Sequence, residues 1–166
     1  MSGLRIVNIA MRALQFLWIL LTLALIGNML SIQSGPSIIN YDMFTAVWCM
    51  LSLLYLLPAT FMDSLAFHWA LPVALDALNV LFTFCAAVAT AAYLGVYSCN
   101  DDSYVATNTV TAGSSQRCRE AQASTAFLWF AWAAFMVTVV TTAIAGRQGG
   151  VTHTTTARRG PAMSQV

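Results

Sequence analysis

Four long runs of hydrophobic residues dominate the chain, and short polar segments containing glycine or proline separate them. The runs cover residues 6–32, 41–61, 70–97 and 121–145. Each is close to or above the roughly 20 residues that an α-helix needs to cross about 30 Å of hydrocarbon. We therefore predict an all-α membrane protein, a bundle of four transmembrane helices within one membrane domain over residues 1–146.

Glycine and proline set the expected helix ends. The sequence Gly35-Pro36-Ser37 predicts the turn between the first two helices. Pro58 should kink the second helix rather than end it, so that this helix reaches residue 61. The polar segment 98–120 should form a loop between the third and fourth helices. Gly146, Gly149 and Gly150 are expected to end the fourth helix and leave residues 147–166 as a tail.

The composition indicates a membrane protein and argues against other classes. Hydrophobic residues make up 59% of the chain and charged residues 8%, whereas about a quarter of the residues of a soluble domain are charged. The formal net charge is +1, and the chain has no long basic run. Nothing in the charge pattern therefore indicates a nucleic-acid partner.

The arginines predict the orientation of the bundle in the membrane. Lysine is absent, and the arginines near the two chain ends are Arg5, Arg12, Arg147, Arg158 and Arg159. Acidic residues in the 98–120 loop balance the two arginines there. The positive-inside rule then places both termini in the cytosol and the loop outside the cell.

Two cysteines, Cys99 and Cys118, flank the polar loop close to the expected helix ends. On an extracellular side, a disulfide between them would close a loop of about 20 residues and contribute roughly 3 kcal/mol in the chain-entropy description. Two free thiols are the alternative, whereas zinc would need two more ligands, and neither histidine is on that side. Cys49 and Cys85 lie inside expected helices, where we interpret them as small apolar packing residues.

Polar residues inside the expected helices are candidates for a functional site, because ionisable groups in a membrane must face the bundle, a cavity or the interface. Arg12 and Gln15 share a face of the first helix, and Asp76, Asn79 and Thr83 share a face of the third. Arg12 and Asp76 should both lie near cytosolic helix ends, where the two could pair. We call these five residues the polar seam. They form either a hydrogen-bonded contact that fixes helix register, which we favour, or a relay or lipid head-group site.

Small residues four positions apart recur on two helices, where they would let helix backbones approach closely in lipid. They are Ala87, Ala91 and Gly95 on the third helix and Ala134, Thr138 and Thr142 on the fourth. Packing within one subunit is the first interpretation. Packing between subunits or against a flat sterol is the second.

The tail offers a weaker lipid contact. Arg147, Arg158 and Arg159 should attract anionic lipid of the inner leaflet, each with about 1 kcal/mol. No group of side chains indicates catalysis: the loop serines have no histidine near them, and two isolated histidines make no metal set. We expect a non-enzymatic protein without a cofactor or a metal ion.

The loop and its flanks also carry a family resemblance. The segments Ser98-Cys99-Asn100, Ser103-Tyr104-Val105, Arg117-Cys118-Arg119 and Ala121-Gln122-Ala123 resemble the fungal non-classical export protein family, as does Phe82-Thr83-Phe84 in the third run. The family consists of MARVEL-type proteins with four transmembrane spans. The resemblance covers essentially the whole chain, and the loop pattern is its most specific part.

The resemblance implies a four-helix organiser of plasma-membrane domains. Such proteins occupy sterol-rich, furrow-like domains associated with eisosomes, where they respond to sphingolipid status and help to shape the furrow. We therefore expect a homo-oligomer that binds sterol, sphingolipid and anionic inner-leaflet lipid, and that contacts eisosome or other membrane proteins. The alternatives are a small transporter, channel or export component that uses Asp76 and Asn79, and an accessory subunit of a larger membrane protein.

Overall fold

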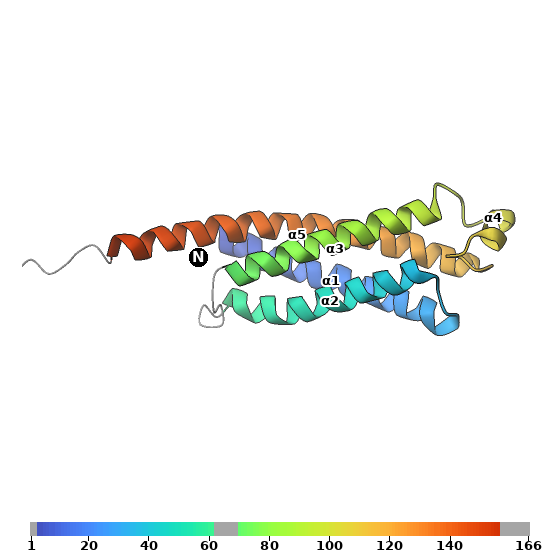
Figure 1. The fold of residues 1–166 in the computed structure, drawn as a ribbon, viewed down its shortest axis with the longest axis horizontal. Coiled ribbons are helices and arrows are strands. Elements are labelled where there is room, and N and C mark those ends of the chain that lie inside the picture. Colours follow the sequence, from blue (N-terminus) through green and yellow to red (C-terminus); the bar gives the residue numbers. More distant parts are fainter. Residues whose placement is uncertain (1–2, 62–69, 157–166) are drawn as a thin grey trace, which may run out of the picture.

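The computed structural model describes residues 3–61 and 70–156, which form a bundle of four long helices with a short helix at one end (Figure 1). The long helices are α1 (Gly3–Ile32), α2 (Ser37–Phe61), α3 (Ala70–Leu94) and α5 (Ser115–Thr156), and the short one is α4 (Asp102–Thr107). Each long helix contains a stretch long and apolar enough to cross a membrane. The prediction of an all-α bundle with four spans is confirmed.

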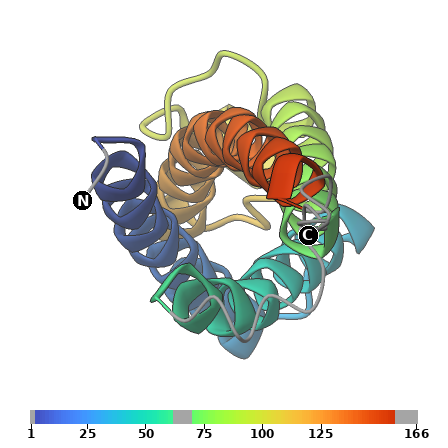
Figure 2. The ribbon, with the colours of Figure 1, turned by 90° about the vertical axis from the view of Figure 1, so that its left-hand side faces the viewer.

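The four long helices alternate in direction and close into a ring (Figure 2). α1 packs against α2 and α5, and α3 also packs against α2 and α5. α1 and α3 therefore face each other across the bundle axis. The α1–α2 turn and α4 lie at one end, which we call the cap end, and the N-terminus lies at the opposite end (Figure 1).

Two helix boundaries differ from the predicted ones because of local backbone signals. α2 begins at Ser37 rather than at residue 41, since the carbonyl of Pro36 accepts hydrogen bonds from the amides of Ile39 (3.0 Å) and Asn40 (3.5 Å). α3 ends at Leu94 rather than at residue 97, since Gly95 adopts a left-handed conformation with φ of +60°. Glycine takes this conformation without the steric penalty of a Cβ atom and commonly ends helices.

α5 is longer at both ends than the predicted fourth span. It begins at Ser115 instead of residue 121, directly after Ala112 and Gly113 turn the chain with φ values of 48° and 79°. Its backbone stays helical to Thr156, beyond the glycines that were expected to end it at residue 145. Glycine inside a helix costs only about 1 kcal/mol relative to alanine, which lowers helix stability without forbidding the helix. The loop is correspondingly shorter, and we call residues 95–114, with α4 among them, the cap.

Buried apolar side chains form layers along the bundle. The layer nearest the cap comprises Ile26, Met29, Ile39, Leu94, Val110 and Ala121. Val110 belongs to the cap itself, so the cap is packed onto the bundle through its own core residue. A second layer, at mid-bundle, comprises Ile19, Cys49, Leu53, Ala131 and Phe135.

The outer faces of the long helices are apolar. Within the most hydrophobic window of each span, only 28–33% of the residues are buried inside the bundle. Large apolar side chains such as Leu17, Leu51, Leu81 and Phe130 are exposed, one on each span. These side chains would contact lipid in a membrane, where apolar surface needs no further cover.

Candidate functional site: the polar interior and the cap

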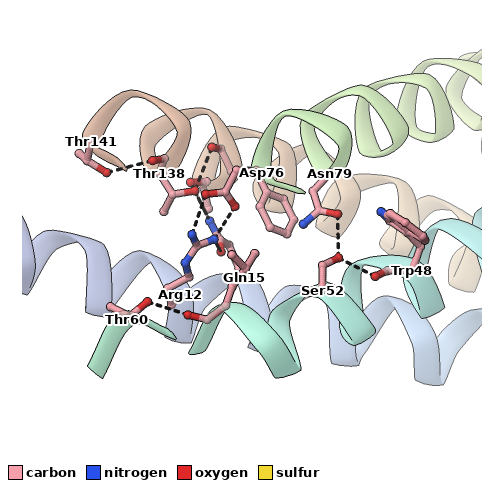
Figure 3. A network of polar contacts seen from close by, with 12 residues as sticks. Arg12, Gln15, Trp48, Ser52, Thr60, Asp76, Asn79, Thr138 and Thr141 are labelled. Atoms are coloured by element: carbon pink, nitrogen blue, oxygen red, sulfur yellow. Dashed lines mark hydrogen bonds and ion pairs between the residues drawn. The ribbon is translucent and has the colours of Figure 1, made fainter. Parts of the chain in front are cut away.

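A buried ion pair joins α1 to α3 across the bundle axis. The Nη1 and Nη2 atoms of Arg12 lie 2.5 Å and 2.6 Å from the two carboxylate oxygens of Asp76 (Figure 3). Arg12 is 2% exposed and Asp76 is fully buried. This two-pronged geometry is the strongest that an arginine and a carboxylate form. The structure therefore gives each of the two buried charges a partner of opposite sign.

Gln15 extends this pair to α5. Its side-chain oxygen accepts a hydrogen bond from Arg12 (3.1 Å), and its amide nitrogen donates to the carbonyl of Ala134 (3.0 Å) and the hydroxyl of Thr138 (2.9 Å). Arg12 and Gln15 lie three positions apart on α1, and Ala134 and Thr138 lie four apart on α5, so each pair shares one helix face. One connected network thus links α1, α3 and α5.

The other two members of the polar seam lie next to this network, towards the cap. Asn79 accepts a hydrogen bond from the hydroxyl of Ser52 (3.0 Å), which joins α3 to α2 (Figure 3). Thr83 donates to the carbonyl of Asn79 in its own helix (2.6 Å). Thr83 therefore satisfies its hydroxyl locally, and its side-chain bonds connect no second helix.

A further buried carboxylate, Asp42, lies on α2 nearer the cap end. It is fully buried and accepts a hydrogen bond from the hydroxyl of Thr90 on α3 (2.6 Å). Its other oxygen and the hydroxyl of Thr45 have no hydrogen-bond partner among the described residues. The predicted polar seam does not include Asp42, because this residue stands at the edge of the span predicted over residues 41–61. The signal was available, since Asp42, Thr45 and Ser52 recur on one helical face.

The small residues do not act as one surface. Ala87 is buried, whereas Ala91 and Gly95 lie on the outside of the bundle. On α5, Ala134 and Thr138 are buried and bonded to Gln15, and Thr142 is partly buried. Ala134 and Thr138 thus serve contacts within the subunit, whereas Ala91 and Gly95 are open to lipid or to another subunit.

The cap is held to the bundle by a disulfide and a buried arginine. Cys99 and Cys118 are bonded, with their Cα atoms 5.7 Å apart, as predicted. Arg117, which is 1% exposed, donates through Nη1 to the carbonyls of Met29 (3.1 Å) and Gln33 (2.9 Å) at the end of α1. The last carbonyls of a helix lack intrahelical partners and favour a cation. The sequence predicts Arg117 only as a charged residue of the loop, so this contact with α1 is a finding of the structure.

The tail residues remain predictions. Arg158 and Arg159 lie outside the described residues, and of Arg147 only the helical backbone is described. Among the residues that the structure describes, no three histidine, cysteine or acidic side chains are grouped so that they could hold a metal ion. The chemistry that the interior supports is hydrogen bonding and ion pairing between helices.

Sequence comparisons identify the family. The MARVEL family, a membrane-associating domain, matches residues 5–141. Non-classical export protein 2 of Saccharomyces cerevisiae is 40% identical over 129 residues, which cover 76% of this chain and 73% of that protein. Non-classical export protein 2 homolog 1 of the same organism is 33% identical over 141 residues, covering 84% and 80%. Non-classical export protein 102 of Candida albicans is 38% identical over 170 residues, covering 98% and 99%.

No solved structure matches the chain. The MARVEL match runs from the first turns of α1 to residue 141 of α5, and so includes the ion pair, the Asp42 site, the cap and its disulfide. The chain is therefore a multi-pass membrane protein that belongs to the MARVEL family and, within it, to the fungal non-classical export proteins.

Proposed function

We propose that this protein is a non-enzymatic organiser of plasma-membrane domains that self-associates laterally and binds sterol and sphingolipid. In this role it would shape furrows of the eisosome type or respond to sphingolipid status. The observation that carries the proposal is the division of polar and apolar surface. Several polar side chains within the spans pair between helices, as Arg12 with Asp76, Ser52 with Asn79 and Thr90 with Asp42, while the outer faces are apolar. Lipids and other membrane helices are the partners that such a surface fits.

The centre of the bundle supports a structural role for the polar seam. Between the Arg12–Asp76 pair and the Asp42–Thr90 contact, beside the bonded Ser52 and Asn79 side chains, lies a layer of apolar side chains that includes Ile19, Leu53 and Phe135. All three are fully buried. An ion or a polar substrate would have to displace this layer to pass through one subunit. The arrangement therefore favours helix registration over conduction along the bundle axis.

The lipid-facing side of α3 and α5 supports selective lipid binding. A groove of about 390 Å³ lies there, lined by Ala77, Val80, Leu81, Phe84, Trp132 and Met136. Phe84 packs against Trp129 and Trp132, with ring centroids 5.9 Å and 5.8 Å apart. Packed aromatic rings make a stiff wall, which loses little conformational entropy when a rigid, flat lipid lies against it. We assign this groove to sterol.

The disulfide supports the proposed orientation. Disulfides persist in oxidising compartments, so Cys99–Cys118 favours an extracellular cap and cytosolic termini in the plasma membrane. The arginines at residues 147, 158 and 159 would then face the anionic inner leaflet. Eisosome components and other membrane proteins remain the expected protein partners.

The second candidate function is transport or export, or an accessory role in a larger membrane complex. The names of the related yeast proteins favour export, and the ion pair between Arg12 and Asp76 is the feature on which a relay would depend. Asp76→Asn keeps the size of the side chain and removes its charge. An export or relay function should lose its activity in this variant, whereas an organiser should change mainly in stability.

Native mass spectrometry of the protein extracted together with its own lipids tests the proposal. We expect oligomers that retain sterol or sphingolipid. Ala77→Phe should fill the groove and release sterol, whereas Ala74→Phe, on an exposed position of α3 outside the groove, should retain it. A lipid-poor monomer would contradict the proposal. A stable complex with a different large membrane protein would instead favour the accessory role.

A further inference from the structure

The cap carries a pocket of its own at the end of α3. Its volume is about 490 Å³, and it is lined by Tyr97, Asp101, Ser103, Tyr104, Thr107 and Asn108. We call it the cap pocket. We propose that the cap pocket binds the trimethylammonium group of phosphatidylcholine. This inference rests on the proposed function only in placing the cap at the surface of a lipid bilayer.

An aromatic wall forms one side of the cap pocket. The rings of Tyr97 and Tyr104 stack with their centroids 4.8 Å apart and their planes 20° apart. The hydroxyl of Tyr104 donates to the carbonyl of Leu94 at the end of α3, which fixes this ring. Tyr97 is 60% exposed, so part of its ring is open to solvent. A cation within about 6 Å of the centre of a tyrosine ring is attracted by the negative face of the ring.

A fixed carboxylate completes the site. The Oδ1 atom of Asp101 accepts hydrogen bonds from the amide (3.0 Å) and hydroxyl (2.6 Å) of Ser103 and from the amide of Tyr104 (3.4 Å). The hydroxyl of Ser103, together with these amides, lowers the pKa of Asp101, so this side chain is ionised at neutral pH. All three bonds use Oδ1, and Oδ2 stays available to a ligand. The pocket lining contains a carboxylate but no arginine, which favours a cation over an anion.

The surface next to the cap pocket argues for a lipid rather than a soluble amine. Val96, which directly precedes Tyr97, is 104% exposed, and Tyr93 is 57% exposed. Tyr93 lies in the last turn of α3, and Val96 lies two residues beyond the end of that helix, where the span ends. Tyrosine is enriched at this membrane–water boundary, where its ring contacts acyl chains and its hydroxyl contacts head groups. A lipid can therefore cover Val96 with its chains and place its head group against Tyr97 and Asp101.

The disulfide should hold the pocket in shape. Cys99 lies two residues before Asp101, and its bond to Cys118 fixes this segment to the first turns of α5. Arg119 on α5 also donates to the side chain of Asn100 (3.0 Å). Reduction of the disulfide should thus weaken head-group selection, because the carboxylate and the tyrosine ring would no longer be held in one arrangement.

The test is lipid selection in nanodiscs that contain equal amounts of phosphatidylcholine and phosphatidylglycerol, which share their chains and differ in the head group. Native mass spectrometry of the released protein reports the retained lipids. Because the tail arginines can retain phosphatidylglycerol in every variant, the readout is the ratio of the two lipids relative to Asp101→Asn. We expect the ratio of phosphatidylcholine to phosphatidylglycerol to be up to about fivefold higher in the wild type than in Asp101→Asn, an enrichment that equals the effect of one exposed charge pair. Asp101→Asn should abolish the enrichment without unfolding α4, because asparagine caps helices as well as aspartate does.

Matched variants make the outcome decisive. Asp102→Asn removes the same charge from the neighbouring exposed position, which does not line the cap pocket, and should keep the enrichment. Tyr97→Phe should keep it and Tyr97→Leu should lose it. The same lipid ratio in the wild type and in Asp101→Asn, or equal effects of Asp101→Asn and Asp102→Asn, would overturn the inference. Because the nanodiscs contain no sterol or sphingolipid, either result leaves the proposed organiser function to its own test.

Discussion

Removing the Asp76 carboxylate should destabilise the protein by about 3–5 kcal/mol, because it would leave the Arg12 guanidinium buried without a counter-charge. The change that we consider is Asp76→Leu, which keeps the branching at Cγ, is larger than aspartate and has no polar atom. Asp76 is fully buried and Arg12 is 2% exposed, so water cannot replace the lost partner without opening the bundle. Gln15 would still accept one hydrogen bond from Arg12, which neutralises no charge.

The structure also gives the scale of the interaction between the two charges. Two parallel hydrogen bonds of 2.5 Å and 2.6 Å connect the guanidinium to the carboxylate. Unit charges about 4 Å apart attract each other by about 4 kcal/mol at an effective dielectric constant of about 20. This attraction offsets the desolvation of both groups and leaves a small net contribution from the intact pair. The double variant Arg12→Met with Asp76→Leu should therefore unfold at nearly the wild-type denaturant concentration.

A double-mutant cycle measured by reversible unfolding in mixed micelles, followed by circular dichroism, tests both statements. Arg12→Lys should fall between the wild type and Asp76→Leu, because an ammonium group cannot make the parallel pair of bonds. Glu120→Ala, which removes exposed hydrogen bonds from Asn28 and Gln116, serves as the control and should change little. A loss below 1 kcal/mol for Asp76→Leu, or a double variant as unstable as the sum of the singles, would refute the reasoning.

Four further predictions concern the cap and the helix ends. Cys99→Ser should lower unfolding stability by roughly 3 kcal/mol, and a thermal midpoint that reductant leaves unchanged would contradict this. Gly95→Ala should lower the free energy of unfolding by about 1 kcal/mol, because residue 95 has a φ of +60°, which disfavours a Cβ atom. Gly27→Ala is its control: apart from its chain neighbours and its own helix backbone, a Cβ atom at residue 27 would meet no atom within 4 Å, so this variant should be neutral or stabilising in the same unfolding assay. Because the pKa of Asp101 is lowered in the folded state, its carboxylate stabilises the cap above the ordinary carboxyl pKa of about 3.9, and this contribution is lost as pH falls through the folded-state pKa. Amide exchange in α4 of the wild type should therefore accelerate over that pH range, whereas in Asp101→Ala the same fall in pH should cause no such acceleration. Arg117→Met should fray the end of α1, seen as faster amide exchange in its last turn.

The sequence predicts the spans, the cap disulfide and the placement of Arg12 and Asp76 in one half of the bundle. These features depend on chain-local signals, namely apolar length, helical spacing and the position of cysteines relative to helix ends. They do not require knowledge of how the helices rotate against each other. The prediction leaves out Asp42, because a carboxylate near a helix end can face either water or the bundle, and only its spacing from Thr45 and Ser52 favours the bundle.

Helix rotation also decides the roles of the small residues. Ala87 and Ala91 lie four positions apart, yet Ala87 is buried and Ala91 is exposed. Four residues turn an α-helix by about 40° beyond a full turn, and at the edge of a packed face this is enough to move a side chain from core to lipid. Arg117 was beyond prediction for a different reason, since its acceptors belong to the distant end of α1.

α3 is the helix on which the polar contacts converge. Asp76 pairs with Arg12 of α1, Asn79 accepts a hydrogen bond from Ser52 of α2, and Thr90 donates one to Asp42 of α2. In lipid, apolar contacts between helices compete with equally apolar acyl chains, so hydrogen bonds of this kind decide which register is stable. The end of α3 is also bonded to the cap, where Tyr104 donates to the carbonyl of Leu94. A lipid bound in the cap pocket would therefore be connected, through Tyr104, to α3, which three polar contacts join to α1 and α2. Its binding should consequently stabilise the whole bundle rather than the cap alone.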